Sequence, residues 1–184
     1  CALPIFSPYW KLGELHTSTG TAPFLHRKFG RLPLKTHPVD EPFGVWDPTS
    51  RMTLTCTFVD ACNCPGSVMI VFEQVPNGRG PIIYTCDFRY CDALRQNQTL
   101  QRVASVRCAG VACQQIFVDV TCAHKSLFKL PTQEHSIGQL LDLLEHEGSG
   151  GTVFLHSHGL GDEEVLSAVG ARGLGKLKFA CKRS

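Results

Sequence analysis

The chain has 184 residues, ten cysteines and a formal net charge of +2, and 43% of its residues are hydrophobic. A chain of this length folds by default as one domain with a sizeable core. It contains no run of about 18 apolar residues, which excludes a membrane-spanning helix, and its small net charge disfavours nucleic acid as a partner.

The first part of the chain is rich in proline. Residues 1–50 hold seven of the eleven prolines and show neither helical nor alternating periodicity. Because proline fixes φ and removes a backbone donor, we expect an extended arm here. Its seven aromatic residues favour an arm that packs on the rest of the protein.

A basic cluster lies within this arm and consists of Arg27, Lys28, Arg31 and Lys35. Such clusters hold anionic glycans, lipid headgroups or acidic protein surfaces by screened electrostatics. We therefore take the cluster as a candidate partner-binding surface. The alternative is a solvated face that keeps the protein soluble.

From residue 51 the pattern is that of strands. Residues 51–59 alternate between apolar side chains and threonine, which predicts a half-buried strand. Residues 67–75 are apolar on both faces and predict a central strand. Asn77-Gly78 is typical of a hairpin turn. Further strands are expected at 81–88, 100–108 and 114–122.

The cysteine spacing favours disulfides over a metal site. The chain has no C-x2-C pair, the spacing typical of structural zinc. An even number of cysteines, paired, indicates an oxidising compartment. The cysteines expected in disulfides are Cys1, Cys56, Cys62, Cys64, Cys86, Cys91, Cys108, Cys113, Cys122 and Cys181. Their connectivity does not follow from the sequence.

Two further features fit secretion. Asn97-Gln98-Thr99 is an N-glycosylation acceptor, which predicts a surface loop with Asn97 as the modified residue. A cleaved signal peptide would leave a mature chain that begins at or near Cys1. The expected location is therefore extracellular.

The last third of the chain has helical spacing. Ser136 with Gln139 forms a capping-box pattern before a leucine-rich helix. A strand is expected at 152–157, a second helix from Asp162, and a final strand at 176–182. The pattern predicts a β-α-β-α-β tail.

His156 and His158 are two residues apart on the strand expected at 152–157, so their rings should share one face. The pair is a candidate metal site that needs a third ligand, and the alternative is two solvent-facing histidines on an edge strand. The segment from His158 to Asp162 resembles the oxyanion loop of α/β-hydrolase thioesterases. The chain has no G-x-S-x-G nucleophile elbow, so we assign no catalytic residue, metal or cofactor.

The sequence thus predicts an α+β, mainly β fold with a disulfide-stabilised antiparallel body, sandwich-like or barrel-like. The expected parts are an arm at 1–50, a cysteine-rich body at 51–125 and an α/β tail at 126–184, all in one compact unit. The predicted function is that of a secreted protein, not an enzyme, which binds an extracellular protein such as a receptor or host target, or an anionic glycan. The alternatives are a secreted enzyme and a glycan-binding or extracellular-matrix protein.

Overall fold

The computed structural model describes residue 10 and residues 13–73, 80–105, 115–121, 131–147, 152–156 and 161–173. The chain divides into two compact units, Cys1–Ala123 and His124–Ser184. The finer division into arm, body and tail stays a prediction. Among the described helices, none combines the length and the apolar character that crossing a bilayer requires.

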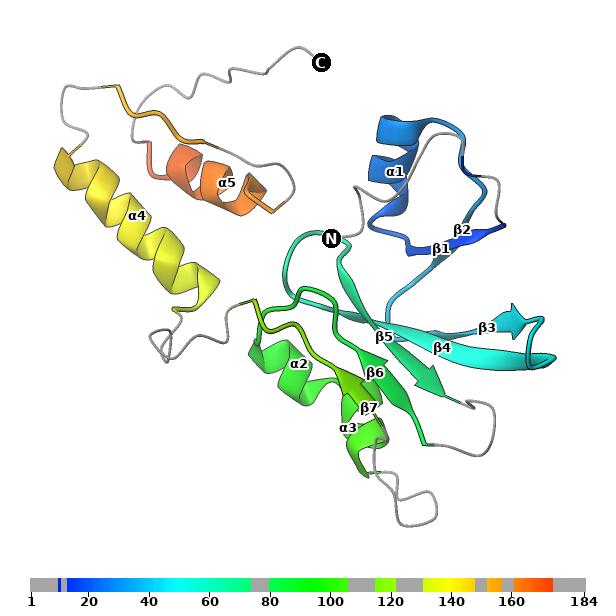
Figure 1. Cartoon of the computed structure of the whole chain (residues 1–184). Helices are drawn as coiled ribbons and strands as arrows, with labels where there is room; N and C mark the ends of the chain where they lie inside the picture. Colours follow the sequence, from blue (N-terminus) through cyan, green and yellow to red (C-terminus); the bar gives the residue numbers. More distant parts are fainter. Residues whose placement is uncertain are drawn as a thin grey trace. The chain divides into compact units, whose positions relative to one another are not determined.

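The first unit is built on a five-stranded sheet in the order β3-β4-β5-β6-β7 (Figure 1). Strands β3 to β6 are antiparallel to their neighbours, and β7 runs parallel to β6. The strands are β3 (Pro42–Asp47), β4 (Met52–Asp60), β5 (Val68–Glu73), β6 (Ile82–Tyr84) and β7 (Gln115–Phe117). The period-two pattern of 51–59 and the apolar run of 67–75 therefore correspond to β4 and β5.

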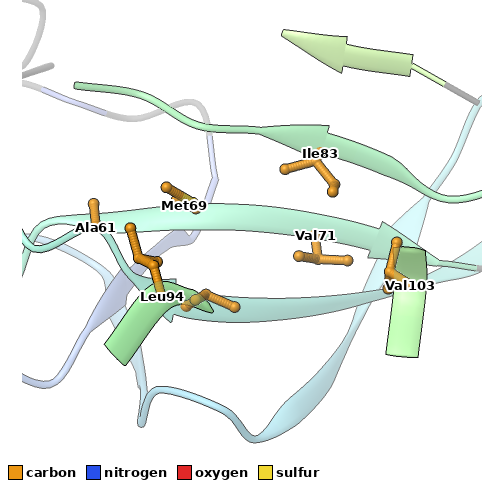
Figure 2. Close-up of a cluster of buried hydrophobic side chains, with 7 residues drawn as sticks. Ala61, Met69, Val71, Ile83, Leu94 and Val103 are labelled. Carbon is orange, nitrogen blue, oxygen red and sulfur yellow. The ribbon is translucent and has the colours of Figure 1, made fainter. Parts of the chain in front are cut away.

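One face of this sheet is covered by two short helices, α2 (Asp92–Gln96) and α3 (Gln98–Ser105). Figure 2 shows Leu94 of α2 near Met69 of β5, and Val103 of α3 toward the end of the cluster that holds Val71 and Ile83. Val71 and Val103 are fully buried. Burying an aliphatic side chain of this size contributes about 1.5–3 kcal/mol, so this layer is the main core of the first unit.

The other face meets a second, smaller structure. Strands β1 (Leu15–Ser18) and β2 (Leu34–His37) pair in parallel and are joined by helix α1 (Ala22–Phe29), which makes a β-α-β unit. His37 of β2 stacks on Phe43 of β3 with 3.6 Å between ring centroids, and Phe43 meets Phe58 of β4 at 4.8 Å. Aromatic side chains therefore join this unit to the sheet.

The structure corrects the expectation for the first 50 residues. The segment contains β1, α1 and β2, and it also supplies β3 to the main sheet. Proline does not prevent this arrangement, because Pro23 lies at the start of α1, where a missing N–H costs no helical hydrogen bond. The expected extended arm is wrong for these residues.

The strand expected at 100–108 is also wrong, because residues 98–105 form α3. The Oδ1 atom of Asn97 accepts a hydrogen bond from the backbone N–H of Leu100 at 3.0 Å, and the Asn97 carbonyl accepts one from Gln101. Asn97 is therefore the N-cap of the helix. The buried Thr99 and Val103 lie one helical turn apart and pack toward the core.

Within the described residues the fold is mixed α/β with two open sheets, and the expected closed barrel is not formed. The described cysteines are free thiols: Cys56, Cys62, Cys64, Cys86 and Cys91. A disulfide-stabilised body is therefore not supported. The predicted cysteines that lie outside the described residues are Cys1, Cys108, Cys113, Cys122 and Cys181.

The second unit contains helices α4 (Gln133–Glu147) and α5 (Glu163–Ala171), both of which were expected. Helix α4 begins three residues before Ser136, because Thr132 Oγ1 accepts the N–H of His135 as a cap. An Arg172–Glu145 ion pair joins the ends of the two helices. The described residues 152–156 form no strand, and the strand expected at 176–182 lies outside the described residues.

Candidate functional site

Three loops meet at one edge of the five-stranded sheet, where β4, β6 and β7 end. The backbone N–H of Arg89 donates to the carbonyl of Ala61 at 2.9 Å, which joins the loop after β6 to the loop after β4. The N–H of Asp119 donates to Thr85 Oγ1 at 3.1 Å, which adds the loop after β7. Segments that are distant in the sequence thus form one surface.

Two residues of these loops have an unusual backbone conformation. Cys62 has φ +52° and Cys86 has φ +50°. A side chain at positive φ costs energy, and such conformations cluster at functional sites, where the surrounding structure maintains them. Asp60 stabilises the first of them, because its Oδ1 accepts the N–H of Cys62 at 2.8 Å. This edge is therefore the candidate functional site.

The loop after β4 is fixed to the turn that precedes α1. The carbonyl of Gly66 accepts hydrogen bonds from Ser18 Oγ at 2.7 Å and from Thr21 Oγ1 at 2.8 Å. Gly66 has φ +81°, and a Cβ atom placed there would lie 2.7 Å from the backbone nitrogen of Thr21. Only glycine fits this contact, which fixes the β-α-β unit to the edge of the sheet.

An aspartate lies at each of the three positions: Asp60 ends β4, Asp87 is in the loop after β6, and Asp119 is in the loop after β7. Thr121 donates from its hydroxyl and its N–H to the carboxylate of Asp119, which lowers the pKa of that group. The lowered pKa favours the ionised form of Asp119, which can attract a cation. Within the described part of the chain, no group of three or more His, Cys, Asp or Glu residues is arranged to hold a metal ion.

Three of the described cysteines have a raised pKa. Burial, together with a hydrogen bond to Cys91, raises the pKa of Cys62 to about 12. Burial raises the pKa of Cys56 to about 11 and also raises the pKa of Cys86. A protonated thiol is a poorer nucleophile than a thiolate, so we look first to the carboxylates of this edge.

A separate cavity of about 590 Å³ lies at the opposite end of β4 and β5, under α3. Its rim holds a two-pronged ion pair between Arg102 and Glu73, in which Nη2 donates to Oε2 at 3.0 Å. Thr57 lines the cavity, is 1% exposed, and its Oγ1 has no hydrogen-bond partner among the described residues. Arg102 pairs with Glu73, and the remaining carboxylate of the lining, Asp40, accepts a hydrogen bond from Asn97.

The predicted site residues lie in different places. The basic cluster is on the surface of the β-α-β unit, and all four of its cations are exposed. Asn97 caps α3 and also donates from Nδ2 to Asp40 Oδ1 at 2.7 Å, so its amide nitrogen is already engaged. His156 belongs to the second unit, and His158 lies outside the described residues. Glycosylation of Asn97 and metal binding by the histidine pair stay predictions.

Comparison with known proteins finds relatives that include enzymes whose names describe action on nucleic acid. No known protein-family profile matches the chain. The chain is 29% identical over 118 residues to DNA ligase 6 of Arabidopsis thaliana, which covers 62% of this chain and 8% of the ligase. It is 32% identical over 98 residues to the 5′ exonuclease Apollo of Rattus norvegicus, which covers 53% and 16%. It is 28% identical over 108 residues to protein artemis of Homo sapiens, which covers 58% and 14%.

These similarities overturn the functional prediction. A DNA ligase and a 5′ exonuclease are enzymes that act on nucleic acid, so the expected secreted binding protein, the expected lack of enzymatic activity and the exclusion of nucleic acid are wrong. The extracellular location and the extracellular protein partner are wrong for the same reason. The matched segments cover less than a fifth of each of these relatives, so their full activities are proposals for this chain.

The site residues that sequence reasoning missed are the three aspartates. Asp60 is the last residue of β4, and Asp87 and Asp119 follow β6 and β7. A sheet with β4, β6 and β7 in the same direction brings these positions to one edge. That positional signal was present in the sequence. It was passed over because the cysteines beside each strand were interpreted as disulfides.

Proposed function

We propose that this chain is part of a DNA-processing enzyme that hydrolyses the phosphodiester backbone at 5′ ends. The observation that carries the proposal is the similarity to a DNA ligase and to 5′ exonucleases, two kinds of enzyme whose reactions share the DNA phosphodiester bond. The aligned part includes more than half of this chain in each case.

The geometry of the sheet edge supports hydrolysis. In this reaction water attacks phosphorus, the bond from phosphorus to the leaving sugar oxygen breaks, and the proton of the water is transferred to a base. A carboxylate at this edge, Asp119 or Asp87, can accept that proton. Developing negative charge on the phosphate needs a cation nearby, and Arg89 lies on the same loop as Asp87.

The proposal is tested with a DNA duplex that carries a 5′ phosphate on one strand and a fluorophore at the 3′ end of that strand. The chain should shorten this strand progressively from its 5′ end. Removal of a proton acceptor costs about 10²–10⁴ in rate, so Asp87→Asn and Asp119→Asn should each lose at least about a hundredfold.

The matched control is Asp92→Asn. Asp92 is an exposed carboxylate on α2, 83% accessible and paired with Arg95 at 3.9 Å, so its neutralisation should leave the rate within about twofold of the wild type. Intact DNA after incubation with the wild-type chain would contradict the proposal. So would cleavage that Asp87→Asn and Asp119→Asn reduce no more than Asp92→Asn.

A further inference from the structure

We infer that the β1–α1–β2 unit is the surface that binds the phosphate backbone of DNA, through Arg27, Lys28, Arg31 and Lys35. The inference rests on the proposed function and adds to it the place where the substrate is bound. It is drawn from the charge, the exposure and the anchoring of this unit.

The unit carries an excess of positive charge in its second half. Between Leu15 and Val39 the sequence contains no aspartate or glutamate, while it contains these four lysine and arginine residues. The whole chain has a net charge of only +2. The four positive charges on this one unit therefore exceed the net charge of the protein, and the rest of the chain must be acidic on balance. A local excess of one sign attracts a polyanion even when the total charge is small.

Among the described residues, none of these four charges is part of an ion pair. The ion pairs that the described part of the chain forms lie elsewhere and involve Arg95, Arg102 and Arg172. Lys28 lies 5.4 Å from the ring centroid of Phe29, which leaves its ammonium hydrogens available to an anion. All four cations are exposed, so a phosphate can reach them without displacing an internal partner.

The apolar packing of α1 and of the segment after it fixes the positions of the cations. Ala22 and Leu25 of α1 and Leu32 after it are buried, so the helix is packed through its apolar side. Gly30, at φ +72°, ends the helix. Two of the cations precede this glycine in the last turn of α1, Arg31 follows it, and Lys35 lies in β2. Four cations placed in this way make a surface rather than a single anion pocket.

The chemistry of the surface favours DNA over a protein partner. Stable protein interfaces need buried apolar or aromatic anchors at their centre. None of the large exposed hydrophobic residues lies between residues 15 and 37. A surface that offers separate cations without an apolar anchor fits a ligand with regularly repeated phosphates.

The unit is also connected to the candidate site. The Ser18–Thr21 turn that begins α1 holds the Gly66 carbonyl of the loop after β4. DNA that binds the cations of α1 is therefore bound by an element fixed to the edge that carries Asp60. This arrangement gives the basic unit a positioning role and leaves the reaction to the carboxylates.

The experiment measures binding of a fluorescent DNA duplex by anisotropy between about 50 and 200 mM salt, with the double variant Arg27→Ala/Arg31→Ala. Each lost phosphate contact reduces the slope of log K against log salt by about 0.9. The variant should therefore bind roughly tenfold more weakly at low salt and show a slope smaller by about 1.8. Arg27→Lys/Arg31→Lys should restore binding, because a phosphate contact needs mainly the charge.

The matched control is Arg95→Ala/Arg172→Ala, which removes the same charge from two ion-paired arginines. It should change the slope by less than about half a unit. Circular dichroism melting of every variant shows whether it is folded. Equal slopes for the two double variants would overturn the inference, and so would tight binding of heparin by a chain that does not bind DNA.

The two proposals can fail separately. If the wild type shortens DNA while Arg27→Ala/Arg31→Ala binds it unchanged, the binding surface is wrong and the proposed function stands. If the wild type binds DNA with the expected slopes but never cleaves it, the binding surface stands and the proposed hydrolysis is wrong.

Discussion

The two faces of the five-stranded sheet are packed in different ways. One face is covered by α2 and α3 with aliphatic side chains such as Val71 and Val103, which are fully buried. The other face carries Phe43 and Phe58, which meet His37 of the β-α-β unit. The aliphatic layer closes the core, whereas the aromatic layer joins a basic unit to the sheet, so the same strands serve stability on one side and attachment on the other.

Two consecutive residues of β4 allow the packing of each face of the sheet to be tested separately. Phe58 faces the aromatic layer and Val59 faces the aliphatic layer, and both are buried. Phe58→Ala should cost about 3–5 kcal/mol of unfolding free energy, and Val59→Ala about 2–3. Urea denaturation measures both values.

The two variants should also differ in which region of the protein they destabilise. Phe58→Ala should speed hydrogen exchange of the amides of residues 15–37, since the unit loses its aromatic contact with the sheet. Val59→Ala should change the exchange rates of these amides only as much as its change in global unfolding free energy requires. If both variants changed exchange in the same regions, the two faces would not be separate attachments.

Gly66 tests the contact between the unit and the candidate site. Gly66→Ala should cost about 2–4 kcal/mol, because it combines an unfavourable positive φ with a clash against the backbone of Thr21. Gly30→Ala is the control, since Gly30 has φ +72° and nothing lies within 4 Å of its Cβ position. Thermal unfolding should show a loss of only about 1–2 kcal/mol for the control. Equal losses would mean that the close approach of Gly66 contributes nothing.

The histidines of the aromatic layer should make stability depend on pH. His16 Nδ1 and His37 Nε2 are 2.9 Å apart, so one ring must donate and the other accept. Burial, His16 and Lys35 together lower the pKa of His37 from its ordinary value of 6.5. The unfolded chain therefore binds the proton first as pH falls, and stability that is present above pH 6.5 decreases as pH falls through the lowered pKa.

Chemical denaturation at pH 7.5 and at pH 5 measures this loss. His37→Gln should reduce the difference between the two pH values, whereas His26→Gln, at an exposed position of α1, should leave it intact. A wild-type chain that is as stable at pH 5 as at pH 7.5 would contradict a buried neutral His37.

The smallest expected effect is on the aliphatic face. Thr57 is buried and its hydroxyl lacks a hydrogen-bond partner in the described structure. Thr57→Val keeps the shape and removes the unpaired oxygen, so it should stabilise the protein by about 1 kcal/mol. Urea denaturation measures the change in unfolding free energy. The control is Thr53→Val, at an exposed position of β4. Destabilisation would mean that the hydroxyl has a partner in solution.

Part of the fold follows directly from the sequence. The alternation in 51–59 and the apolar run in 67–75 predict β4 and β5, because burial on one or both faces fixes the spacing. The leucine spacing after Ser136 predicts α4. Helix α3 escaped prediction because a tertiary contact with the sheet selects helix for a segment that also reads as a strand, and because the cap at Asn97 was interpreted as a glycosylation site.

The candidate site was predictable only in part. The basic cluster around Arg27 is visible as a run of charges, but its partner is not, because net charge over the whole chain hides a local excess. The cysteine count suggested secretion, although a buried thiol such as Cys56 with a raised pKa is an ordinary component of a reduced core. The positions of Asp60 and Asp119 become meaningful only when the strand order is known.

The most direct test of the whole account is steady-state cleavage of 5′-phosphorylated DNA by the wild type and by Arg27→Ala/Arg31→Ala. The account predicts progressive shortening from the 5′ end, with KM raised about tenfold in the variant and kcat unchanged, because the lost contacts bind substrate and transition state equally. A wild-type chain that leaves the DNA intact, or a variant that loses kcat at unchanged KM, would contradict it.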